Sequence, residues 1–538
     1  MTSPIILALA FKKKSGKIPS ALSLTDDYEF IIVENKGKTS SVTTIQVQKS
    51  AHKSNATSDS PIKSITVVYG ENGEGKTALL LDACQSVRSI HNKRRLSIIW
   101  KDESGVIYLD DASDRGGFRI EGPETSKQKK ILNHQFGAVF YTTSPFESNR
   151  RLRLLSSSTI DSTPKSGSAS YSGAALCLAA GSLPKNIPFI RRAKIGIDIE
   201  TSIDIEKEII EADAFLLENY QTGRRSGHLS KQEMALKHVS DLAIGSSPRS
   251  KTLLAIELRR ARLDGAKALD MLLHELTDRR EKRLSDNRSI SQFLRYRIGT
   301  YDTRPTPNKI LDTLVKLKRS ISDTAPKGLS QYARTLRSVS PNISPILQEA
   351  ERLGLITWKF IELSSGQVAL LLLFASLSSA LNNLAAKKIR STLIAIDEGE
   401  MFMHPAWQRQ YIRDILNFIT RHRKDFDQIH LILATHSLIV AGDTPPNRLF
   451  DVKSGSMQNG FALGPKELLD RVYGVKEFSG SMAEDLYKKI ADFMTKSGAS
   501  HTAEAEKDIR HLVNQIASHD LKEYLSAELD ARGVKNID

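Results

Sequence analysis

The chain contains the run Gly70-Glu71-Asn72-Gly73-Glu74-Gly75-Lys76-Thr77, which fits the phosphate-binding pattern G-x-x-x-x-G-K-[ST] at every position. An apolar, β-rich run, Ile62–Tyr69, precedes it, and the segment Ala78–Ala83, which is predicted to be helical, follows it. This strand–loop–helix order is the context that the pattern requires, so a chance glycine-rich turn is the weaker alternative. Backbone N–H groups of the loop and of the helix N-terminus would bind phosphate oxygens. The pattern assigns these contacts to Gly70, Asn72, Gly73, Gly75, Lys76 and Thr77. Lys76 would reach the β- and γ-phosphates, and Thr77 would bind Mg²⁺.

A second run, Thr392–Ile396, is predicted to be a buried strand, and two carboxylates, Asp397 and Glu398, follow it directly. Asp397 lies where a carboxylate can bind Mg²⁺, directly or through water. Glu398 lies where it can orient or deprotonate an attacking water. A strand that happens to end in acidic residues is the alternative, but the phosphate loop in the same chain favours a nucleotide site.

Two further segments carry polar residues at the ends of predicted elements. Leu363–Gln367 precedes a long apolar helix. Its polar residues can cap that helix and present a hydroxyl and N–H groups to an anion. They are Ser364, Ser365, Gly366 and Gln367. His436 follows the apolar strand Ile429–Ala434, where it can hydrogen-bond a phosphate oxygen. Taken alone, an ordinary helix cap and a structural histidine are the better interpretations.

Together and in this order, the four segments resemble the motifs of the ATP-binding-cassette (ABC) ATPases. Leu363–Gln367 resembles the signature motif of that superfamily, and His436 resembles its switch histidine. The resemblance implies ATP and Mg²⁺ as cofactors and Glu398 and His436 as catalytic residues. It also implies that two heads sandwich two nucleotides, so that Ser364 acts on the ATP bound by the other chain. Because the chain has one set of motifs, the resemblance implies a homodimer or a higher oligomer.

The run Asp397–Gln408 narrows the resemblance to RecF/SMC/OLD-like ATPases, since it is similar to their D-E-P-E…L-H-P-x-W-Q run. Gly399 replaces the usual proline, and Met403 replaces the usual leucine. His404 is interpreted as ordering the turn after the site, with a metal role as the weaker alternative. At Tyr141–Phe146, Thr or Ser stands where many relatives carry a glutamine that senses Mg²⁺. The combination resembles the ATPase subunit of Septu-type and retron-associated antiphage systems.

The sequence offers no convincing nuclease site of its own. OLD-type nucleases continue after the switch histidine into a Toprim domain, but no Asp-x-Asp cluster follows His436. Arg423 and His430 have the R-x₆-H spacing of some RNases, yet they straddle a predicted core strand, which favours coincidence. The resemblance therefore implies a separate effector. In Septu-like systems this is an HNH-type nuclease, and in retron-associated systems the partner is a reverse transcriptase with its reverse-transcribed DNA.

Composition is typical of a soluble globular protein in a reducing, cytoplasmic setting. Of 538 residues, 40% are hydrophobic and 26% are charged. Two cysteines, Cys84 and Cys177, are too few for a zinc site or a disulfide framework. The apolar run Val368–Leu377 is too short to span a bilayer, and Ile5–Ala10 lacks the positive region of a signal peptide. We therefore expect no membrane association. A net charge of +15 favours a nucleic-acid partner, with a basic but merely soluble surface as the alternative.

We expect an α/β fold: an ABC-ATPase head with a mostly parallel core sheet, a β-rich N-terminal part, a helical insertion and a C-terminal helical tail. The head comprises residues 1–150, with the phosphate loop, and 351–465, with the other three motifs. Residues 151–350 form a Ser-rich loop and a basic helical insertion, and 466–538 form the tail. In the insertion Lys251–Arg283 is predicted to be helical. The wider segment 251–297 holds twelve Lys/Arg against seven Asp/Glu, so it is the candidate surface for nucleic acid.

The expected function is that of an ATP-binding and ATP-hydrolysing regulatory subunit of a bacterial antiphage complex, which dimerises around ATP to control a separate nuclease. The alternative is a RecF/SMC-like ATPase of DNA repair or chromosome maintenance. A transporter ATPase belongs to a different class, because it needs a membrane partner. The positive charge and the run Glu400–Gln408 argue against that class.

Overall fold

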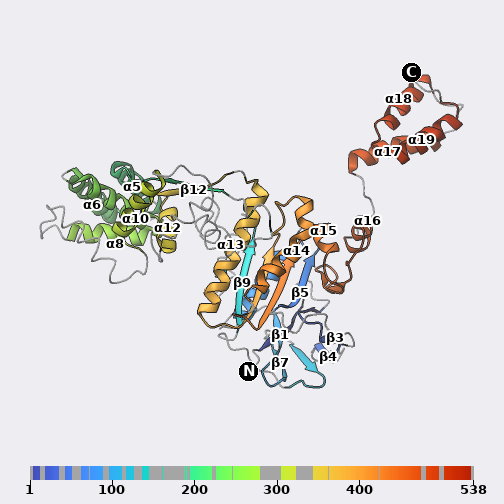
Figure 1. Cartoon of the computed structure of the whole chain (residues 1–538), viewed down its shortest axis with the longest axis horizontal. Coiled ribbons are helices and arrows are strands. Elements are labelled where there is room, and N and C mark those ends of the chain that lie inside the picture. Colours follow the sequence, from blue (N-terminus) through green and yellow to red (C-terminus); the bar gives the residue numbers. More distant parts are fainter. Residues whose placement is uncertain are drawn as a thin grey trace. The chain divides into compact units, whose positions relative to one another are not determined.

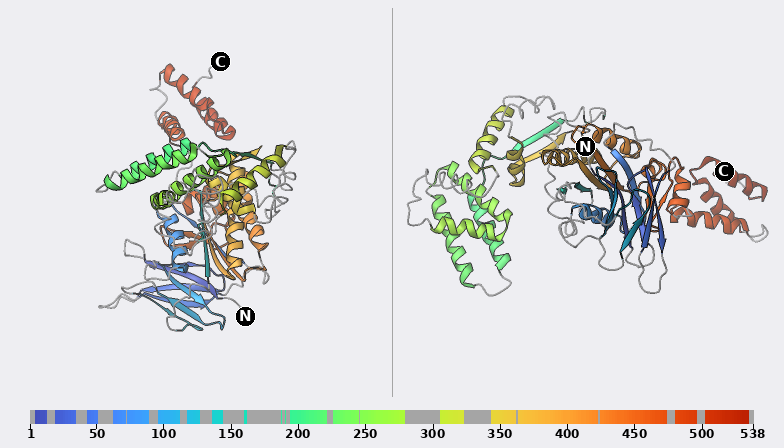
Figure 2. Two further views of the ribbon diagram at one scale, coloured as in Figure 1. Left: turned by 90° about the vertical axis from the view of Figure 1, so that its left-hand side faces the viewer. Right: turned by 90° about the horizontal axis from the view of Figure 1, so that it is seen from below.

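The computed structural model describes residues 4–12, 19–34, 43–50, 62–71, 73–88, 96–111, 117–126, 136–143, 160–161, 187, 190, 194–220, 226–244, 246–278, 305–322, 343–361, 363–422, 424–473, 480–495 and 502–534. Asn72, Ser144–Phe146, Arg423 and residues 279–297 lie outside these ranges, so what the sequence predicts for them stays a prediction. The chain forms two compact units, Met1–Ala462 and Leu463–Asp538. Figure 1 shows their elements, and Figure 2 shows them from two further sides.

The centre of the first unit is a seven-stranded sheet in which all neighbours pair in parallel except β15 and β16. In their order across the sheet, the strands are β10 (Ile160–Asp161), β9 (Phe136–Thr142), β13 (Ser391–Asp397), β14 (Gln428–Ala434), β5 (Ile62–Tyr69), β15 (Leu449–Asp451) and β16 (Ser456–Gln458). β9, β13 and β14 are buried along their whole length, which is typical of parallel strands covered on both faces. The expected α/β class with a mostly parallel core sheet is confirmed.

Parallel pairing places the carboxyl ends of four strands at one edge of this sheet. Asp397, the last residue of β13, is in register with Thr142 on β9 and with Ala434 on β14. β5 ends beside β14, because Val68 is in register with Ala434. The segments that follow these four strands carry most of the candidate site residues, so those residues meet at this edge.

Helices cover both faces of the core sheet. α1 (Lys76–Arg88) packs against β9, β13 and β14, and α13 (Ser365–Ala386) packs against β9. Alternate residues of β9 face the two helices, since Ala138 shares an apolar cluster with α1 whereas Gly137 faces Leu384 of α13. α14 (Pro405–Thr420) adjoins α13 through a contact of two phenylalanine rings, and the short α15 (Leu438–Gly442) packs against α14.

Among the described helices, α13 is the one that is long and apolar enough to cross a membrane, judged by length and composition alone. However, 61% of its most apolar window is buried inside the unit. Phe374 of α13 and Phe418 of α14 have ring centroids 5.1 Å apart. This packing, together with the contact with β9, is that of a core helix.

Two smaller sheets make up the β-rich N-terminal part. One has the order β2–β1–β6–β7 and the other the order β3–β4–β8. Their strands are β1 (Ile5–Lys12), β2 (Pro19–Ser23), β3 (Tyr28–Glu34), β4 (Thr43–Lys49), β6 (Ser97–Lys101), β7 (Ile107–Asp110) and β8 (Phe118–Glu121). The first sheet packs against α1 through Leu9, Ile98 and Trp100. Its other face shares a second apolar cluster with the three-stranded sheet, which includes Ala8 and Ile45.

The helical insertion lies between two strands that pair antiparallel, β11 (Lys194–Ile199) and β12 (Ile356–Ile361). Its helices are α5 (Ile205–Tyr220), α6 (Ser226–Ile244), α7 (Pro248–Asp264), α8 (Ala266–Asp278), α10 (Pro307–Ser322) and α12 (Ile343–Arg352). α7 is central, because it packs against α5, α6, α8 and α10. A continuous helix over 251–283 is wrong, since α7 and α8 are separated by Gly265. This residue has a φ of 105°, which favours glycine, and its N–H donates to the carbonyl oxygen of Arg262 at 3.1 Å.

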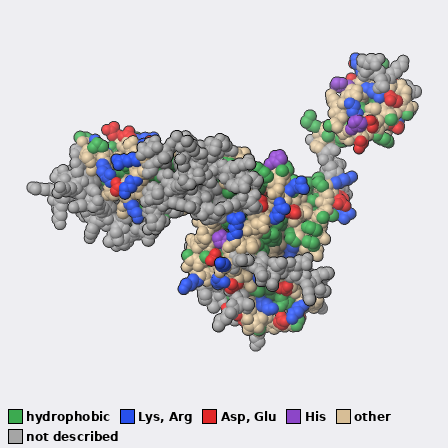
Figure 3. Space-filling view, viewed as in Figure 1, with side chains coloured by type: hydrophobic (Ala, Val, Ile, Leu, Met, Phe, Trp, Pro, Cys, Tyr) green, Lys and Arg blue, Asp and Glu red, His purple; other side chains and the backbone are tan. Residues whose placement is uncertain are grey.

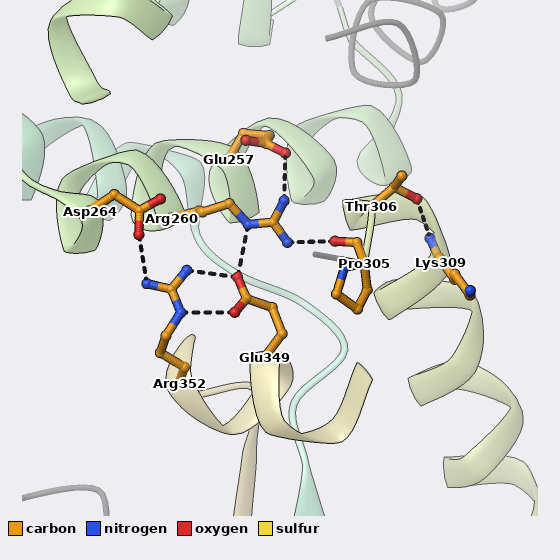
Figure 4. A network of polar contacts seen from close by, with 8 residues as sticks. All are labelled: Glu257, Arg260, Asp264, Pro305, Thr306, Lys309, Glu349 and Arg352. Carbon is orange, nitrogen blue, oxygen red and sulfur yellow. Dashed lines mark hydrogen bonds and ion pairs between the residues drawn. The ribbon is translucent and has the colours of Figure 1, made fainter. Parts of the chain in front are cut away.

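Three arginines of α7 are bonded to carboxylates inside the insertion, and Figure 4 shows these bonds for Arg260. Arg260, whose side chain is 5% exposed, donates from Nε to Oε1 of Glu349 on α12 at 3.0 Å. It also pairs with Glu257 at 3.3 Å. Arg262 pairs with Glu208 of α5 at 3.1 Å. These buried ion pairs hold α5, α7 and α12 together.

These contacts narrow what can be expected of the basic segment 251–297. The arginines at 259, 260 and 262 contribute to its positive count, but each faces a carboxylate within the insertion. On the face seen in Figure 3, basic side chains of the insertion lie beside acidic ones. The prediction that this segment binds nucleic acid therefore depends on its other basic residues, including those of 279–297.

The second unit is a small helical unit. Its elements are α16 (Pro465–Glu467), the π-helical turn η3 (Leu468–Val472), α17 (Ser481–Thr495), α18 (Ala503–Asn514) and α19 (His519–Ala531). An apolar core forms from Ile490, Ile509, Val513, Leu529 and Val534. Buried Arg510 of α18 pairs with Asp530 of α19 and donates to the carbonyl oxygen of Val534, so it fastens the two helices together. The expected helical tail is confirmed.

Replacing Glu349 by alanine should destabilise the insertion by roughly 3 kcal/mol, because it removes the main partner of a buried guanidinium. Glu257 still faces Arg260, so the effect lies at the low end of the range for a broken buried pair. Hydrogen exchange of the α7 and α12 amides measures the stability of the insertion by itself. A local measurement is needed because a chain of more than one unit has no single free energy of unfolding.

The matched control is Asp312→Ala on α10, which breaks the exposed pair with Arg249, in which both side chains are 52% exposed. This change should cost no more than about 1 kcal/mol. Equal losses of protection in the Glu349 and Asp312 variants would contradict a structural role for the buried network.

Candidate nucleotide-binding site

The phosphate loop follows β5 directly and curls into the N-terminus of α1. Gly73 and Gly75 have φ angles of 85° and 100°, in the region that favours glycine. Glu74 braces the loop, since its Oε2 accepts a hydrogen bond from the N–H of Glu71 at 2.8 Å. A loop of this shape ahead of a helix N-terminus is an anion-binding arrangement.

Lys76 lies in the curl of this loop and is 6% exposed. Its Nζ donates to the carbonyl oxygens of Gly70 and Glu71 at 2.9 and 3.0 Å. Burial lowers the pKa of Lys76, whereas nearby carboxylates, foremost Glu398, raise it. An ammonium held here by two carbonyls can turn to a phosphate, which is the stronger acceptor.

Thr77 and Asp397 meet at the sheet edge although they lie 320 positions apart in the sequence. Thr77 Oγ1 donates to Asp397 Oδ2 at 2.9 Å, and Thr142 Oγ1 donates to the same oxygen at 3.1 Å. Asp397 is 1% exposed. A hydroxyl and a carboxylate beside the phosphate loop are the hard oxygen ligands that Mg²⁺ prefers, so these residues fit a nucleotide-bound magnesium ion.

Glu398 has a left-handed backbone, with a φ of 52°. This conformation costs a residue other than glycine roughly 1–2 kcal/mol, so the surrounding contacts must hold it. The Glu398 N–H donates to the carbonyl oxygen of Ala434 at 3.0 Å. Its own carbonyl oxygen accepts from Thr143 Oγ1 at 2.7 Å and from the Met401 N–H at 3.1 Å. These bonds fix the direction in which the Glu398 side chain leaves the sheet edge.

His436 lies opposite that side chain. Its Nε2 is 3.5 Å from Glu398 Oε1, and the two side chains are 37% and 22% exposed. Burial lowers the pKa of His436, and the charge of Lys76 lowers it further, while Glu398 raises it. The imidazole is therefore mostly neutral at pH 7, and it can donate from one ring nitrogen.

The turn after Glu398 has room only for glycine. A Cβ atom at Gly399 would lie 2.3 Å from Tyr411 Oη and 2.7 Å from Ile396 Cγ2. Tyr411 belongs to α14 and is 2% exposed, so its ring cannot move aside to make room for a Cβ atom. This packing explains why glycine stands where the similar motif of RecF/SMC/OLD-like ATPases has proline.

The next carboxyl, Glu400, is buried rather than exposed to a substrate. It is 3% exposed and accepts a hydrogen bond from Thr435 Oγ1. Burial raises the pKa of Glu400 to about 7, against the effect of that bond, and the charges of Glu398 and Asp397 raise it further. Because it is buried and bonded to Thr435, the Glu400 carboxyl lies beside the site and is not exposed to a substrate.

The segment Ser364–Gln367 forms the N-terminal cap of α13. Ser364 Oγ accepts from the Gln367 N–H at 3.3 Å, and Gln367 Oε1 accepts from the Ser364 N–H at 2.8 Å, which is a capping box. A Cβ at Gly366 would lie 2.2 Å from the Phe402 carbonyl oxygen, so that backbone approach requires glycine. Ser364 and Ser365 are exposed. Across the described residues, no hydrogen bond or ion pair connects this segment with the phosphate loop of its own chain.

Several side chains of the site were not predicted from the sequence. They are Thr142, Thr143, Glu400 and Thr435. Thr142 and Thr143 stand in the segment where many similar ATPases carry glutamine, and their hydroxyls bond the Asp397 carboxylate and the Glu398 carbonyl. The sequence did carry one sign of them, because two hydroxyl residues stand at the end of a predicted buried strand, as the two carboxylates stand at the end of another.

Two other histidines singled out in the sequence have structural contacts. His404 caps α14, since its Nδ1 accepts from the Ala406 N–H at 3.2 Å. His430 is fully buried within β14, where its Nδ1 is 3.1 Å from Ser64 Oγ, and burial lowers its pKa to about 4. His404 therefore orders the start of α14, and the burial of His430 leaves it no access to a nucleic-acid substrate. Within the ranges that the structure describes, no group of three or more His, Cys, Asp or Glu could hold a metal ion.

One protein-family model matches the chain, over residues 239–441, and its description is "AAA domain, putative AbiEii toxin, Type IV TA system". The match covers less than half of the chain. It includes the segments with Ser364, Asp397, Glu398 and His436 but not the phosphate loop. None of the curated proteins compared with the chain matches it.

Among solved structures, the chain is similar to "Structure of the recombination mediator protein RecF-ATPrS in RecFOR pathway". The two are 12% identical, the match covers 81% of this chain and 99% of that chain, and the TM-score is 0.23. A TM-score of 0.23 at 12% identity does not establish a shared fold or function. The family match, whose description names an AAA domain, and the phosphate-binding loop, carboxylates and histidine at one sheet edge together support a P-loop ATPase.

Proposed function

We propose that this chain is the ATP-binding and ATP-hydrolysing regulatory subunit of a cytoplasmic, bacterial antiphage complex, which dimerises around ATP to control a separate nuclease. The observation that carries the ATPase part is the convergence of Lys76, Thr77, Asp397, Glu398 and His436 at one sheet edge. These groups come from three loops that are far apart in the sequence. Their chemistry is that of phosphate binding, cation binding and proton transfer.

Each residue has a defined part in the proposed hydrolysis. Lys76 and the loop amides bind the phosphates, and Thr77 and Asp397 hold Mg²⁺, which neutralises phosphate charge when bound. Glu398 accepts a proton from the attacking water. The water oxygen bonds to the γ-phosphorus, and the bond between the γ-phosphorus and ADP breaks. His436 donates a hydrogen bond to a γ-phosphate oxygen. The products are ADP and phosphate.

Dimerisation is proposed from the exposed signature segment. Ser364 and Ser365 are exposed at the start of α13, and Ser364 shares its described side-chain bond with Gln367 of the same cap. A helix N-terminus with exposed hydroxyls can bind an anion presented from outside the chain. In the proposal, that anion is the γ-phosphate held by Lys76 of a second copy.

The role in defence has weaker support, which comes from two sources. The matching family model is described as a putative AbiEii toxin of a Type IV toxin–antitoxin system. The run Glu400–Gln408 resembles that of defence-associated ATPases. We propose an HNH-type nuclease as the effector, and a reverse transcriptase with its DNA as a further partner. The net charge of +15 favours contact with nucleic acid, directly or through that partner.

Glu398→Gln should bind ATP as the wild type does and lose turnover by roughly 10²–10⁴-fold, because an amide cannot accept the proton of water. Phosphate release and equilibrium binding of ATP measure the two effects separately. Glu523→Gln makes the same chemical change on an exposed helix of the tail and should leave both unchanged. Turnover that survives in Glu398→Gln would show that a different group is the base.

A mixing experiment tests whether the site is shared between two chains. Ser364→Arg blocks the face that acts in trans, and Lys76→Ala removes the phosphate-binding charge, so each variant alone should be inactive. In a one-to-one mixture, half of the dimers are mixed and each has one intact site of two, so about a quarter of the activity should return.

The control mixture contains Ser364→Arg and the double variant Lys76→Ala/Ser364→Arg, in which no composite site is intact. It should show no recovery. If mixed dimers are demonstrated by mass spectrometry and still show no activity, the shared site is excluded.

A further inference from the structure

A closed ring of hydrogen bonds connects the loop after Glu398 with the loop that carries His436. Glu400 accepts from Thr435 Oγ1, which in turn accepts from the Ser437 N–H at 2.9 Å. Ser437 Oγ donates to Gln408 Oε1 at 2.7 Å. Gln408 Nε2 completes the ring by donating to the Met403 carbonyl oxygen at 3.1 Å, with the Glu400 carbonyl oxygen at 3.5 Å.

The ring holds both neighbours of His436 and leaves the imidazole itself outside it. Thr435, before the histidine, is bonded to Glu400, and Ser437, after it, is bonded to Gln408. The Thr435 N–H also donates to the carbonyl oxygen of Val68 at 3.1 Å, which ties this loop to the end of β5. The backbone on either side of His436 is therefore fixed relative to the loop that carries Glu398.

The ring has little freedom to rearrange. Thr435 is fully buried and Glu400 is 3% exposed, so water does not compete for their bond. Tyr411 fills the space beside Gly399, which confines the start of the loop. Gln408 must keep its amide oriented with the oxygen towards Ser437 and the nitrogen towards Met403, because only that orientation satisfies both partners. A network in which every member has a partner specifies one arrangement. Here the bond between Glu400 and Thr435 is buried, and Ser437 and Gln408 are half-buried.

We infer that Glu400 and Gln408 are positioning residues, which hold His436 at Glu398 through the backbone of its two neighbours. The inference rests on the proposed ATPase function. Neither residue touches the nucleotide in this account, so their loss should act on the chemical step. A displacement of about 1 Å at a catalytic group can lower a rate by about 10²-fold, whereas the contacts that bind ATP stay in place.

The test is a double-mutant cycle between Glu400→Ala and His436→Ala, read out as kcat and as KM for ATP. Each change alone should lower kcat by roughly 10²-fold at nearly constant KM, and the double variant should be no slower than the slower single variant. Glu400→Gln keeps an acceptor oxygen for Thr435, so it should restore kcat to within about threefold of wild type. Gln408→Ala should resemble Glu400→Ala.

Thr435→Val removes the hydroxyl with little change of volume and serves where Glu400→Ala fails to fold. Its matched control is Thr66→Val on β5, which removes an equally buried hydroxyl bonded to the Ser23 carbonyl oxygen at 3.1 Å. Thr435→Val should lower kcat as Glu400→Ala does. Thr66→Val should reduce stability by a similar amount but leave kcat unchanged.

The outcomes separate the two claims. If turnover survives Glu398→Gln, the proposed function fails, and the inference fails with it. If Glu398→Gln abolishes turnover but the losses of Glu400→Ala and His436→Ala multiply, the proposed function stands and the positioning role is overturned. Equal kcat losses in Thr435→Val and Thr66→Val would likewise reduce the ring to a stabilising contact.

Discussion

The hydrogen bond from Thr77 to Asp397, at 2.9 Å, is the contact on which the candidate site depends. It joins the first turn of α1 to the end of β13, and it forms because β5, β14, β13 and β9 run in parallel and end at one edge. A slip of β13 by one residue would turn Asp397 to the opposite face and put Ile396 in its place. The apolar strands therefore do more than fill the core, since their register sets the distance between the phosphate loop and the carboxylates.

The loops at this edge are held in conformations that they would not adopt alone. Glu398 keeps a left-handed backbone because three hydrogen bonds, one of them from the Thr143 hydroxyl, fix its peptide groups. Gly399 follows because Tyr411 leaves no room for a Cβ atom. Strain at a site is retained where the surroundings over-determine it, and the site and its packing then constrain each other.

The motifs and the parallel core sheet were predictable because both depend on residues that are close together in the sequence. A glycine–lysine spacing after an apolar strand, and strands that are apolar throughout, need no knowledge of distant residues. The rest depends on contacts between segments far apart. The hydroxyl of Thr142 matters because Asp397 lies across from it, and the charge of Arg260 is internal because Glu349 packs against it. The sequence also did not decide whether the helix would break at Gly265, since one glycine costs a helix only about 1 kcal/mol and can be tolerated.

Calorimetric titration of the full chain with a non-hydrolysable ATP analogue, with and without Mg²⁺, tests the central claim most directly. Thr77→Val is the matching variant, because it has nearly the shape of threonine and lacks the hydroxyl. The account predicts that Mg²⁺ strengthens binding to the wild type and that Thr77→Val and Asp397→Asn lose most of this gain. Binding that is equally strong without Mg²⁺, or a gain that survives in both variants, would contradict the assignment of this sheet edge as the ATP·Mg²⁺ site.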